Sequence, residues 1–167
     1  MYKFKQDLAM AYFDGCSKKT ASRLLAREIN LTPGLLDALR PTGYRPAQKR
    51  LSPRQLQILF SHLGEQVFVG FMQSLVLHYT ERRTVAEYAA EASLSVRHFS
   101  TLIHQYTGRT PMQWIHVFTI GQAKHLLQSN LQIKEIADRV GFPEQFTFRK
   151  YFKTHTGISP SQYRKVQ

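Results

Sequence analysis

Hydrophobic and polar positions along this chain follow the period of an α-helix, and glycine and proline residues separate the periodic stretches. Short helices are expected over residues 20–29 and 35–39. Residues 40–50 contain two prolines, one glycine and four basic side chains, which predicts a loop. A further helix is expected to begin at Ser52 and Pro53, because serine is a common N-cap and proline is tolerated in the first turn. It is expected to end near Leu63, before Gly64.

The following stretch, residues 66–79, is apolar on nearly every side, so we expect a buried helix. Its partner is either the interior of this chain or a second subunit. In the second case a homodimer would be held by Phe68, Phe71, Met72 and Leu75. No stretch within residues 5–82 alternates with a period of two, and Tyr2, Phe4 and Gln6 are too few to define a strand. The predicted fold is therefore all-α.

The second half of the chain contains one sequence unit twice. Residues 85–95 match residues 133–143 at an offset of 48, and residues 99–114 match residues 148–163 at an offset of 49. The phrases TGRTPMQW and TGISPSQY are the clearest part of the match. Because such a match is hard to produce by chance, both copies are expected to share one supersecondary structure.

Each copy has the pattern of a helix-turn-helix. In the first copy, a helix over residues 85–91 is followed by a turn and by a helix that Ser95 caps and that runs to about Tyr106. In the second copy the helices span residues 133–140 and 143–156, with Gly141 in the turn. Phe99, Leu102, Ile103 and Tyr106 are expected to point inward. The outward side chains are Arg97, His98, Ser100, Thr101 and His104 in the first copy, and Gln145, Phe146, Arg149, Lys150 and Lys153 in the second.

These outward faces differ from an ordinary solvated surface, because they carry almost no acidic residue apart from Glu144 at a helix start. Arginine, lysine, glutamine, serine and threonine are the groups that bind base edges and phosphates. A hydrated basic helix is the alternative for either face alone. Between the copies, residues 110–128 predict a helix about 28 Å long, close to the ~34 Å between successive major-groove faces of DNA. Gly121 is the weak point of that helix.

The charge of the chain indicates a polyanionic partner. The sequence has 23 lysines and arginines against 11 acidic residues, a net charge of +12, divided equally between residues 1–82 and 83–167. Nucleic acid is the first candidate and an acidic membrane surface the second. An apolar content of 43% argues against a disordered tail, and no apolar stretch is long enough to span a bilayer. The single cysteine, Cys16, excludes an internal disulfide framework, and the N-terminus does not resemble a secretory signal.

No motif for catalysis, cofactor binding or metal binding is visible. The seven histidines include no pair four residues apart, and there is no glycine-rich phosphate loop. Cys16 has no neighbouring group that would activate it as a nucleophile. We therefore expect neither an enzyme nor a resident metal or cofactor.

At this point residues 84–166 resemble the AraC/XylS family of bacterial transcription regulators. The second copy, IKEIADRVGFPEQFTFRKYFKTHTGISPSQYRK, follows the family's I-A-x-x-V-G-F, F-x-x-x-F-K and G-x-S/T-P-x-x-Y-R at the right spacings. The resemblance implies a seven-helix domain in which two helix-turn-helix units, joined by a long helix, enter adjacent major-groove segments. It also implies activation of transcription through contacts with RNA polymerase.

Carried over by position, the resemblance assigns base contacts to both reading helices, residues 95–106 and 143–156. Arginine binds guanine and glutamine binds adenine in a bidentate manner. Phe146 would meet a thymine methyl group or pack against the neighbouring helix. Thr110 and Ser159 would donate to phosphates or only cap their helices. The base contacts are Arg97, Ser100, Thr101, Gln145, Phe146 and Lys150, and the backbone contacts are His98, His104, Thr110, Arg149, Lys153 and Ser159.

Two departures from the family pattern affect the prediction. Thr119 stands where relatives commonly have arginine, which removes an ion pair or a phosphate contact. Residues 1–82 are too short and too helical for the β-barrel effector domain that usually precedes this domain. The chain is then a piece of a longer regulator or a compact member with a helical N-terminal region. We expect that region over residues 1–82, with a dimer helix at 66–79, and the DNA-binding domain over residues 83–167.

The leading hypothesis is a sequence-specific regulator of transcription that binds double-stranded promoter DNA, acts as an activator and resides in the bacterial cytoplasm at the nucleoid. No membrane association is expected of it. The alternative is a helical protein-interaction module whose basic surface does not read DNA sequence. A mobility-shift assay on genomic DNA fragments separates the two.

Overall fold

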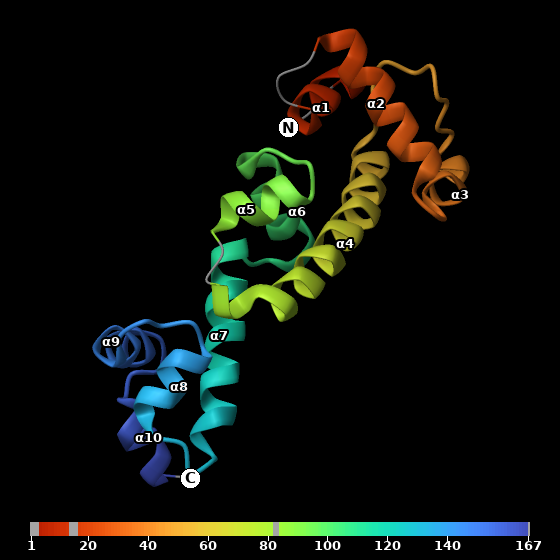
Figure 1. Cartoon of the computed structure of the whole chain (residues 1–167). Helices are drawn as coiled ribbons and strands as arrows, with labels where there is room; N and C mark the ends of the chain where they lie inside the picture. Colours follow the sequence, from red (N-terminus) through yellow and green to blue (C-terminus); the bar gives the residue numbers. More distant parts are fainter. Residues whose placement is uncertain (1–3, 14–16, 82–83, 167) are drawn as a thin grey trace. The chain divides into compact units, whose positions relative to one another are not determined.

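The structure is a computed structural model of the chain, and it describes residues 4–13, 17–81 and 84–166. Over these residues it contains ten α-helices, two short 3-10 helices and no β-strand (Figure 1). The predicted all-α fold is therefore confirmed. Tyr2 and Cys16 lie outside the described residues. The helices are α1 (Lys5–Tyr12), α2 (Lys18–Leu31), α3 (Leu35–Leu39), α4 (Pro53–His78), α5 (Val85–Glu91), α6 (Val96–Thr107), α7 (Pro111–Leu127), α8 (Ile133–Arg139), α9 (Gln145–Thr156) and α10 (Pro160–Val166), with 3-10 turns at Arg40–Thr42 and Tyr79–Glu81.

The helices form two compact units. The N-terminal unit comprises residues 1–72 and 85–110, and the C-terminal unit comprises residues 73–84 and 111–167. The expected domain boundary, between residues 82 and 83, does not separate these units. The reason is that the first helix-turn-helix packs with the N-terminal helices.

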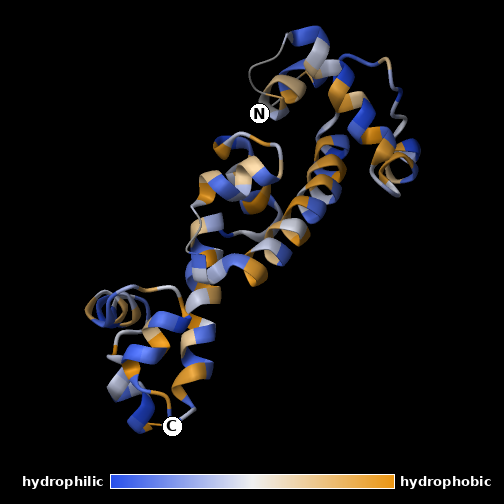
Figure 2. Ribbon diagram, in the orientation of Figure 1, coloured by the Kyte–Doolittle hydropathy of each residue, from blue (hydrophilic) through white to orange (hydrophobic). Residues whose placement is uncertain are grey.

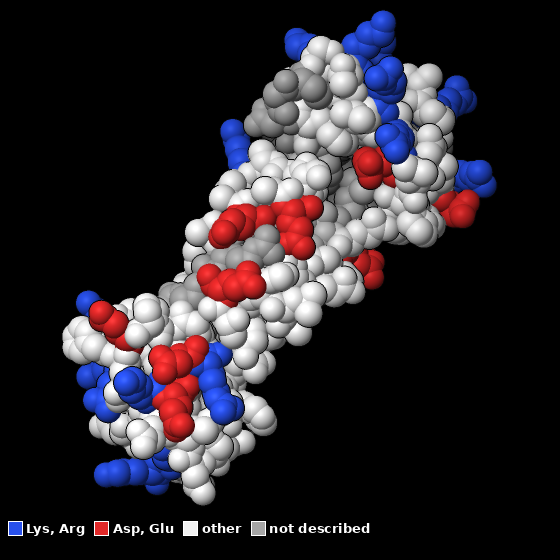
Figure 3. Space-filling view, viewed as in Figure 1, with Lys and Arg blue, Asp and Glu red and all other residues white. Residues whose placement is uncertain are grey.

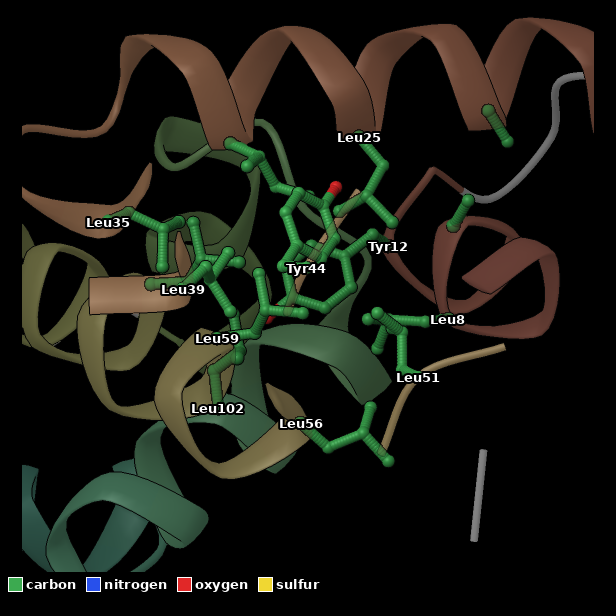
Figure 4. Close-up of a cluster of buried hydrophobic side chains, with 14 residues drawn as sticks. Leu8, Tyr12, Leu25, Leu35, Leu39, Tyr44, Leu51, Leu56, Leu59 and Leu102 are labelled. Atoms are coloured by element: carbon green, nitrogen blue, oxygen red, sulfur yellow. The ribbon is translucent and has the colours of Figure 1, made fainter. Parts of the chain in front are cut away.

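The core of the N-terminal unit is built from α1–α4 and from Tyr44 and Leu51 of the segment between α3 and α4, with one side chain from α6 (Figure 4). Residues four apart share one face of a helix, so Ala21, Leu25 and Ile29 form a single buried face of α2. Figure 2 shows the apolar and polar residues of these helices. Leu102 of α6 is fully buried in the same cluster as Leu59 of α4. The first predicted reading helix is thus anchored in a core made mostly by residues 8–63.

Helix α1 is held in place by a buried lysine. The Nζ atom of Lys5 donates to the Tyr44 hydroxyl at 2.7 Å and to the Pro46 carbonyl at 2.8 Å. Phe4, where the sequence hinted at a strand, forms one isolated antiparallel bridge with Arg50. Burial lowers the pKa of Lys5 and raises the pKa of Tyr44. These contacts fix residues 4–5 against the loop that follows α3.

Helix α4 continues through Gly64, where the sequence predicted a break between two helices. A Cβ atom at residue 64 would lie 2.9 Å from the Tyr106 Cβ and 3.4 Å from the Leu102 carbonyl oxygen. This glycine therefore lets α4 approach α6 closely, and it does not end a helix. Sequence alone cannot distinguish these two uses of glycine.

The apolar stretch within α4 is buried on one side only. Phe71 and Leu75, two of the four side chains expected at a dimer interface, are buried within the chain. The Phe71 ring packs edge-on against Tyr88 and Phe99, with centroids 5.1 and 5.4 Å apart. At these two positions the internal alternative holds, and their side chains offer no surface to a second subunit. Phe68 and Met72 are half-buried, and Val69, Val76 and Leu77 are exposed.

The C-terminal unit has a separate core formed by α7, α8 and α9, against which Tyr163 of α10 also packs. Phe142, Phe148 and Phe152 are almost completely buried there. Helix α7 runs without a break through Gly121, where an added Cβ would contact nothing within 4 Å. Thr119 is also buried, so this position does not face solvent. The two helix-turn-helix units therefore rest on two different cores.

Candidate nucleic-acid interface

The turns of the two helix-turn-helix units have the same hydrogen bonds. In the first, the amides of Ser93 and Leu94 donate to the carbonyls of Ala90 and Ala89, both at 2.9 Å. In the second, the residues 48 positions later make the same bonds at 3.1 and 2.8 Å. Ser93 and Gly141 both have a left-handed backbone, with φ of 57° and 79°. The internal repeat thus corresponds to a repeated backbone.

Gly141 has a second role that Ser93 does not share. A Cβ atom at this position would clash with the carbonyl group of Thr80. Both its positive φ and this contact require glycine. The first turn accepts serine because a non-glycine residue in this conformation costs about 1–2 kcal/mol but is not excluded.

The two reading helices also end alike. Gly108 and Gly157 have φ of 72° and 83°, and each donates its amide to the carbonyl four residues earlier at 2.8 Å. The preceding threonine hydroxyl donates to the carbonyl of Ile103 in the first copy and of Phe152 in the second. The two glycine amides thereby satisfy carbonyls of the last turn, which a helix end leaves without partners. The phrases TGRTPMQW and TGISPSQY therefore encode a common helix stop.

On α6, Arg97 and His104 are exposed, and Ser100 and Thr101 are partly exposed. Thr101 uses its hydroxyl hydrogen on the Arg97 carbonyl, which leaves the hydroxyl oxygen as an acceptor. Ser95 caps the helix by accepting the amide of His98 at 3.3 Å, as predicted. Tyr106, expected to point inward, is 39% exposed. Its ring packs against Phe68 of α4, with the ring centroids 5.7 Å apart.

His98, which we expected to face outward and contact the DNA backbone, is buried. Its side chain is 4% exposed, and its Nδ1 lies 3.3 Å from the carbonyl oxygen of Tyr12 in α1. A carbonyl only accepts, so Nδ1 carries the hydrogen, and Nε2 has no hydrogen-bond partner in the described residues. Burial lowers the pKa of His98 to about 4, against a smaller opposing effect of the Tyr12 carbonyl. The predicted DNA contact of His98 is therefore wrong, because α1 packs on this side of α6 and covers the imidazole.

The predicted contact face of α6 forms one wall of a groove within the N-terminal unit. Arg97, Thr101 and Gln105 lie four residues apart along this wall, and α4 forms the other wall through residues 53–61. Gln105 was absent from the predicted contacts. Its spacing of four residues from Thr101 was the signal that could have identified it.

On α9, the predicted contact residues are more accessible. Phe146 is 75% exposed, so the alternative in which it packs against a neighbouring helix is wrong. Arg149, Lys150 and Lys153 are exposed, and Gln145 is partly exposed. With its amide oxygen turned toward Arg149, Gln145 accepts from the guanidinium at 2.7 Å. The helix begins at Gln145, two residues after the predicted start at Pro143.

Ser159 caps α10. Its Oγ accepts the amide of Gln162 at 3.3 Å and donates to the Gln162 side chain at 2.9 Å. The capping alternative is thus realised at Ser159, while a phosphate contact of the same residue stays a prediction. Among the described residues no group of three or more histidine, cysteine or acidic side chains is placed to hold a metal ion. No described helix is long and apolar enough to cross a membrane.

Comparison with known proteins places this geometry in a family. Residues 88–166 match the helix-turn-helix domain family, and residues 1–65 match a domain of unknown function (DUF4248). The crystal structure of the DNA-binding domain of AdpA in complex with a target DNA is 32% identical, with a TM-score of 0.53 over 57% of this chain and 87% of that one. The class defined by fold and surface is a double helix-turn-helix protein. Through this half of its sequence the chain belongs to the AraC/XylS family of transcription regulators.

Two curated relatives extend the match. The uncharacterized HTH-type transcriptional regulator YisR of Bacillus subtilis (strain 168) is 34% identical over 129 residues, which cover 68% of this chain and 45% of the relative. The arabinose operon regulatory protein of Escherichia coli (strain K12) is 30% identical over 148 residues, 86% of this chain and 44% of the relative. The chain therefore spans less than half the length of these relatives. Both relatives are regulators by name.

Proposed function

We propose that this protein regulates transcription by binding double-stranded promoter DNA in a sequence-specific manner. The observation that carries the proposal is the pair of helix-turn-helix units with matching turns, matching helix stops and polar outward faces. A recognition helix of this kind enters the major groove and reads base edges there. We infer that α6 and α9 read two adjacent major-groove segments, with α7, 17 residues and about 26 Å long, as the connection.

The contact residues follow from exposure and chemistry. On α9, Gln145 would read adenine and exposed Phe146 would contact a thymine methyl group, with Lys150 as a further base contact. On α6, Arg97 would read guanine beside Ser100 and Thr101. Arg149, Lys153, Thr110 and Ser159 would hold the phosphate backbone together with His104, whereas His98 is excluded by its burial.

An activating role, a contact with RNA polymerase, a homodimer and a location at the bacterial nucleoid are finer parts of this proposal. They rest on family membership. For the homodimer, the exposed Val69, Val76 and Leu77 of α4 are the apolar surface that remains after Phe71 and Leu75 are buried.

The decisive experiment is selection of bound duplexes from random DNA with the whole chain, at about 150 mM salt to suppress attraction to the backbone alone. Enrichment of one motif with two contact blocks, one major-groove segment apart, is the expected result. Equal affinity for random and selected duplexes would contradict sequence-specific reading. It would favour the alternative of an interaction module with a basic surface.

A further inference from the structure

Much of the positive charge of this chain lies outside the two helix-turn-helix units, and the proposed function does not use it. Residues 1–50 contain ten lysines and arginines against four acidic residues, and residues 133–166 contain seven against three. The first helix-turn-helix, residues 85–110, has two of each sign and is electrically neutral. Because binding to DNA depends on neutralising phosphates with lysine and arginine, the first unit lacks this attraction by itself. The basic residues that share a compact unit with it are those of the N-terminal helices.

Several of these N-terminal charges are already engaged. Lys5 is buried against Tyr44, Arg40 pairs with Asp37 at 3.2 Å, and Arg50 lies over the Phe4 ring. On α2, by contrast, Lys19, Arg23 and Arg27 are exposed, and no ion pair to any of them occurs among the described residues. Figure 3 shows the lysine and arginine side chains gathered around α1–α3. We call these three residues the basic ridge.

The basic ridge has the geometry of a backbone-binding surface. Its members are four residues apart, so they follow one side of α2 at intervals of about 6 Å. They lie opposite the buried face of Ala21, Leu25 and Ile29, which fixes their orientation toward solvent. Duplex DNA carries one negative charge per ~1.7 Å of axis, so a ridge about 12 Å long faces several phosphates.

A groove runs beside the basic ridge. It is lined by the small side chains of Ser22 and Ala26 on α2 and by Gln48 and exposed Lys49 on the opposite bank, with Asp7 as its one acidic residue. Small residues on one bank and a cation on the other would admit a phosphate chain. The groove and the ridge belong to the same compact unit as α6.

The alternative partner for a basic helix is an acidic membrane. Such a helix inserts an apolar face into the lipid interface while its basic face stays outside. The apolar face of α2 is instead occupied by the protein core, and Leu31 at its end is the one exposed large hydrophobic residue that α2 carries. The chemistry of the ridge therefore fits a phosphodiester backbone better than a lipid surface.

We propose that the basic ridge of α2 binds the phosphate backbone of duplex DNA and supplies the attraction that the first helix-turn-helix lacks. This inference extends the proposed function, but its test is separate. The ridge contributes affinity for every sequence alike, whereas the reading helices contribute preference among sequences.

The experiment compares the whole chain with the double variant Arg23→Ala/Arg27→Ala on a selected 25-base-pair duplex and on a random one, over a salt titration. Two controls are matched: Arg23→Lys/Arg27→Lys keeps the charge, and Arg40→Ala/Arg45→Ala removes equal charge from the loop after α3. Circular dichroism checks that the fold is retained. We expect the ridge variant to bind both duplexes about 30-fold more weakly at 150 mM salt and to lower the salt slope by nearly two, with both controls close to wild type.

Each result decides a different point. A ridge variant with unchanged affinity and slope would overturn the ridge while leaving the reading helices intact. If the ridge variant loses affinity but the wild-type chain prefers no sequence motif, the proposed role of the basic ridge stands and sequence-specific regulation is overturned. Vesicles of phosphatidylserine and phosphatidylcholine provide the last arm: ridge-dependent binding to them that exceeds binding to DNA would reassign the surface to membranes.

Discussion

The helical period predicted the position of His98 on α6 correctly, but the prediction that its side chain is exposed was wrong. His98 lies on the side of α6 that the helical period predicts to face solvent, and α1 covers that side. Because His98 stays neutral in the folded chain down to about pH 4, the unfolded chain binds a proton between pH 6.5 and 4 that the folded chain does not. The contribution of His98 to the free energy of unfolding is therefore fully present above pH 6.5 and is lost as the pH falls toward 4.

We expect wild-type protein to lose about 2 kcal/mol of unfolding free energy from this group between pH 7 and pH 5. His98→Gln keeps a donor for the Tyr12 carbonyl and removes the titration. Denaturant unfolding at the two pH values should show a smaller pH dependence for the variant. Equal pH dependence in both proteins would mean that His98 is protonated without cost.

The contact residues of the two reading helices differ in what their loss should do. Arg97→Ala should cost about 1–3 kcal/mol of binding free energy at one base pair and relax the preference there, because arginine reads guanine.

Lys153→Ala should weaken binding to all sequences and reduce the salt slope by about one, because a phosphate contact has no sequence information. Binding titrations on single-base variants of a selected site measure both effects. A uniform loss from Arg97→Ala would assign that residue to the backbone.

Among whole helices, α4 gives the clearest pair of comparisons. Gly64 faces Tyr106 at a distance that leaves no room for a methyl group, while Gly70 faces open space in the same helix. We expect Gly64→Ala to destabilise the protein by about 1–3 kcal/mol through overpacking. We expect Gly70→Ala to stabilise it by about 0.5–1 kcal/mol, because alanine is the better helix former. Thermal unfolding of both variants, measured together, tests the contact between α4 and α6; a stabilising Gly64→Ala would deny it.

In the molecule as a whole, local signals predicted most of the helices, but they predicted neither α1 nor the long-range packing between helices. The repeat predicted both helix-turn-helix units because the turn and stop residues are close in sequence and occur twice. The extent of α3 and α5 was predicted to the residue. The packing of α1 on α6 was not predicted. Tyr12 and His98 are 86 positions apart, and no local pattern in the sequence indicates that they are in contact. Gly64 was misjudged for the same reason: its partner, Tyr106, lies far along the chain.

This packing makes a prediction for a shortened chain that begins at residue 73. It retains the C-terminal unit but removes almost all of the core around Leu102. Hydrogen exchange should find α7–α10 protected as in the whole chain and α6 much less protected. Full protection of α6 in the shortened chain would show that the N-terminal helices are dispensable for it.

Leu102 also bears on how such a protein evolves. Its side chain packs in a core whose other buried members lie about forty or more positions upstream, on the far side of the expected domain boundary. Gene fusions that exchange one upstream module for another succeed where few contacts cross the junction. Here a new upstream partner would have to present the same apolar walls, so we expect residues 1–63 and the first helix-turn-helix to be inherited as one piece.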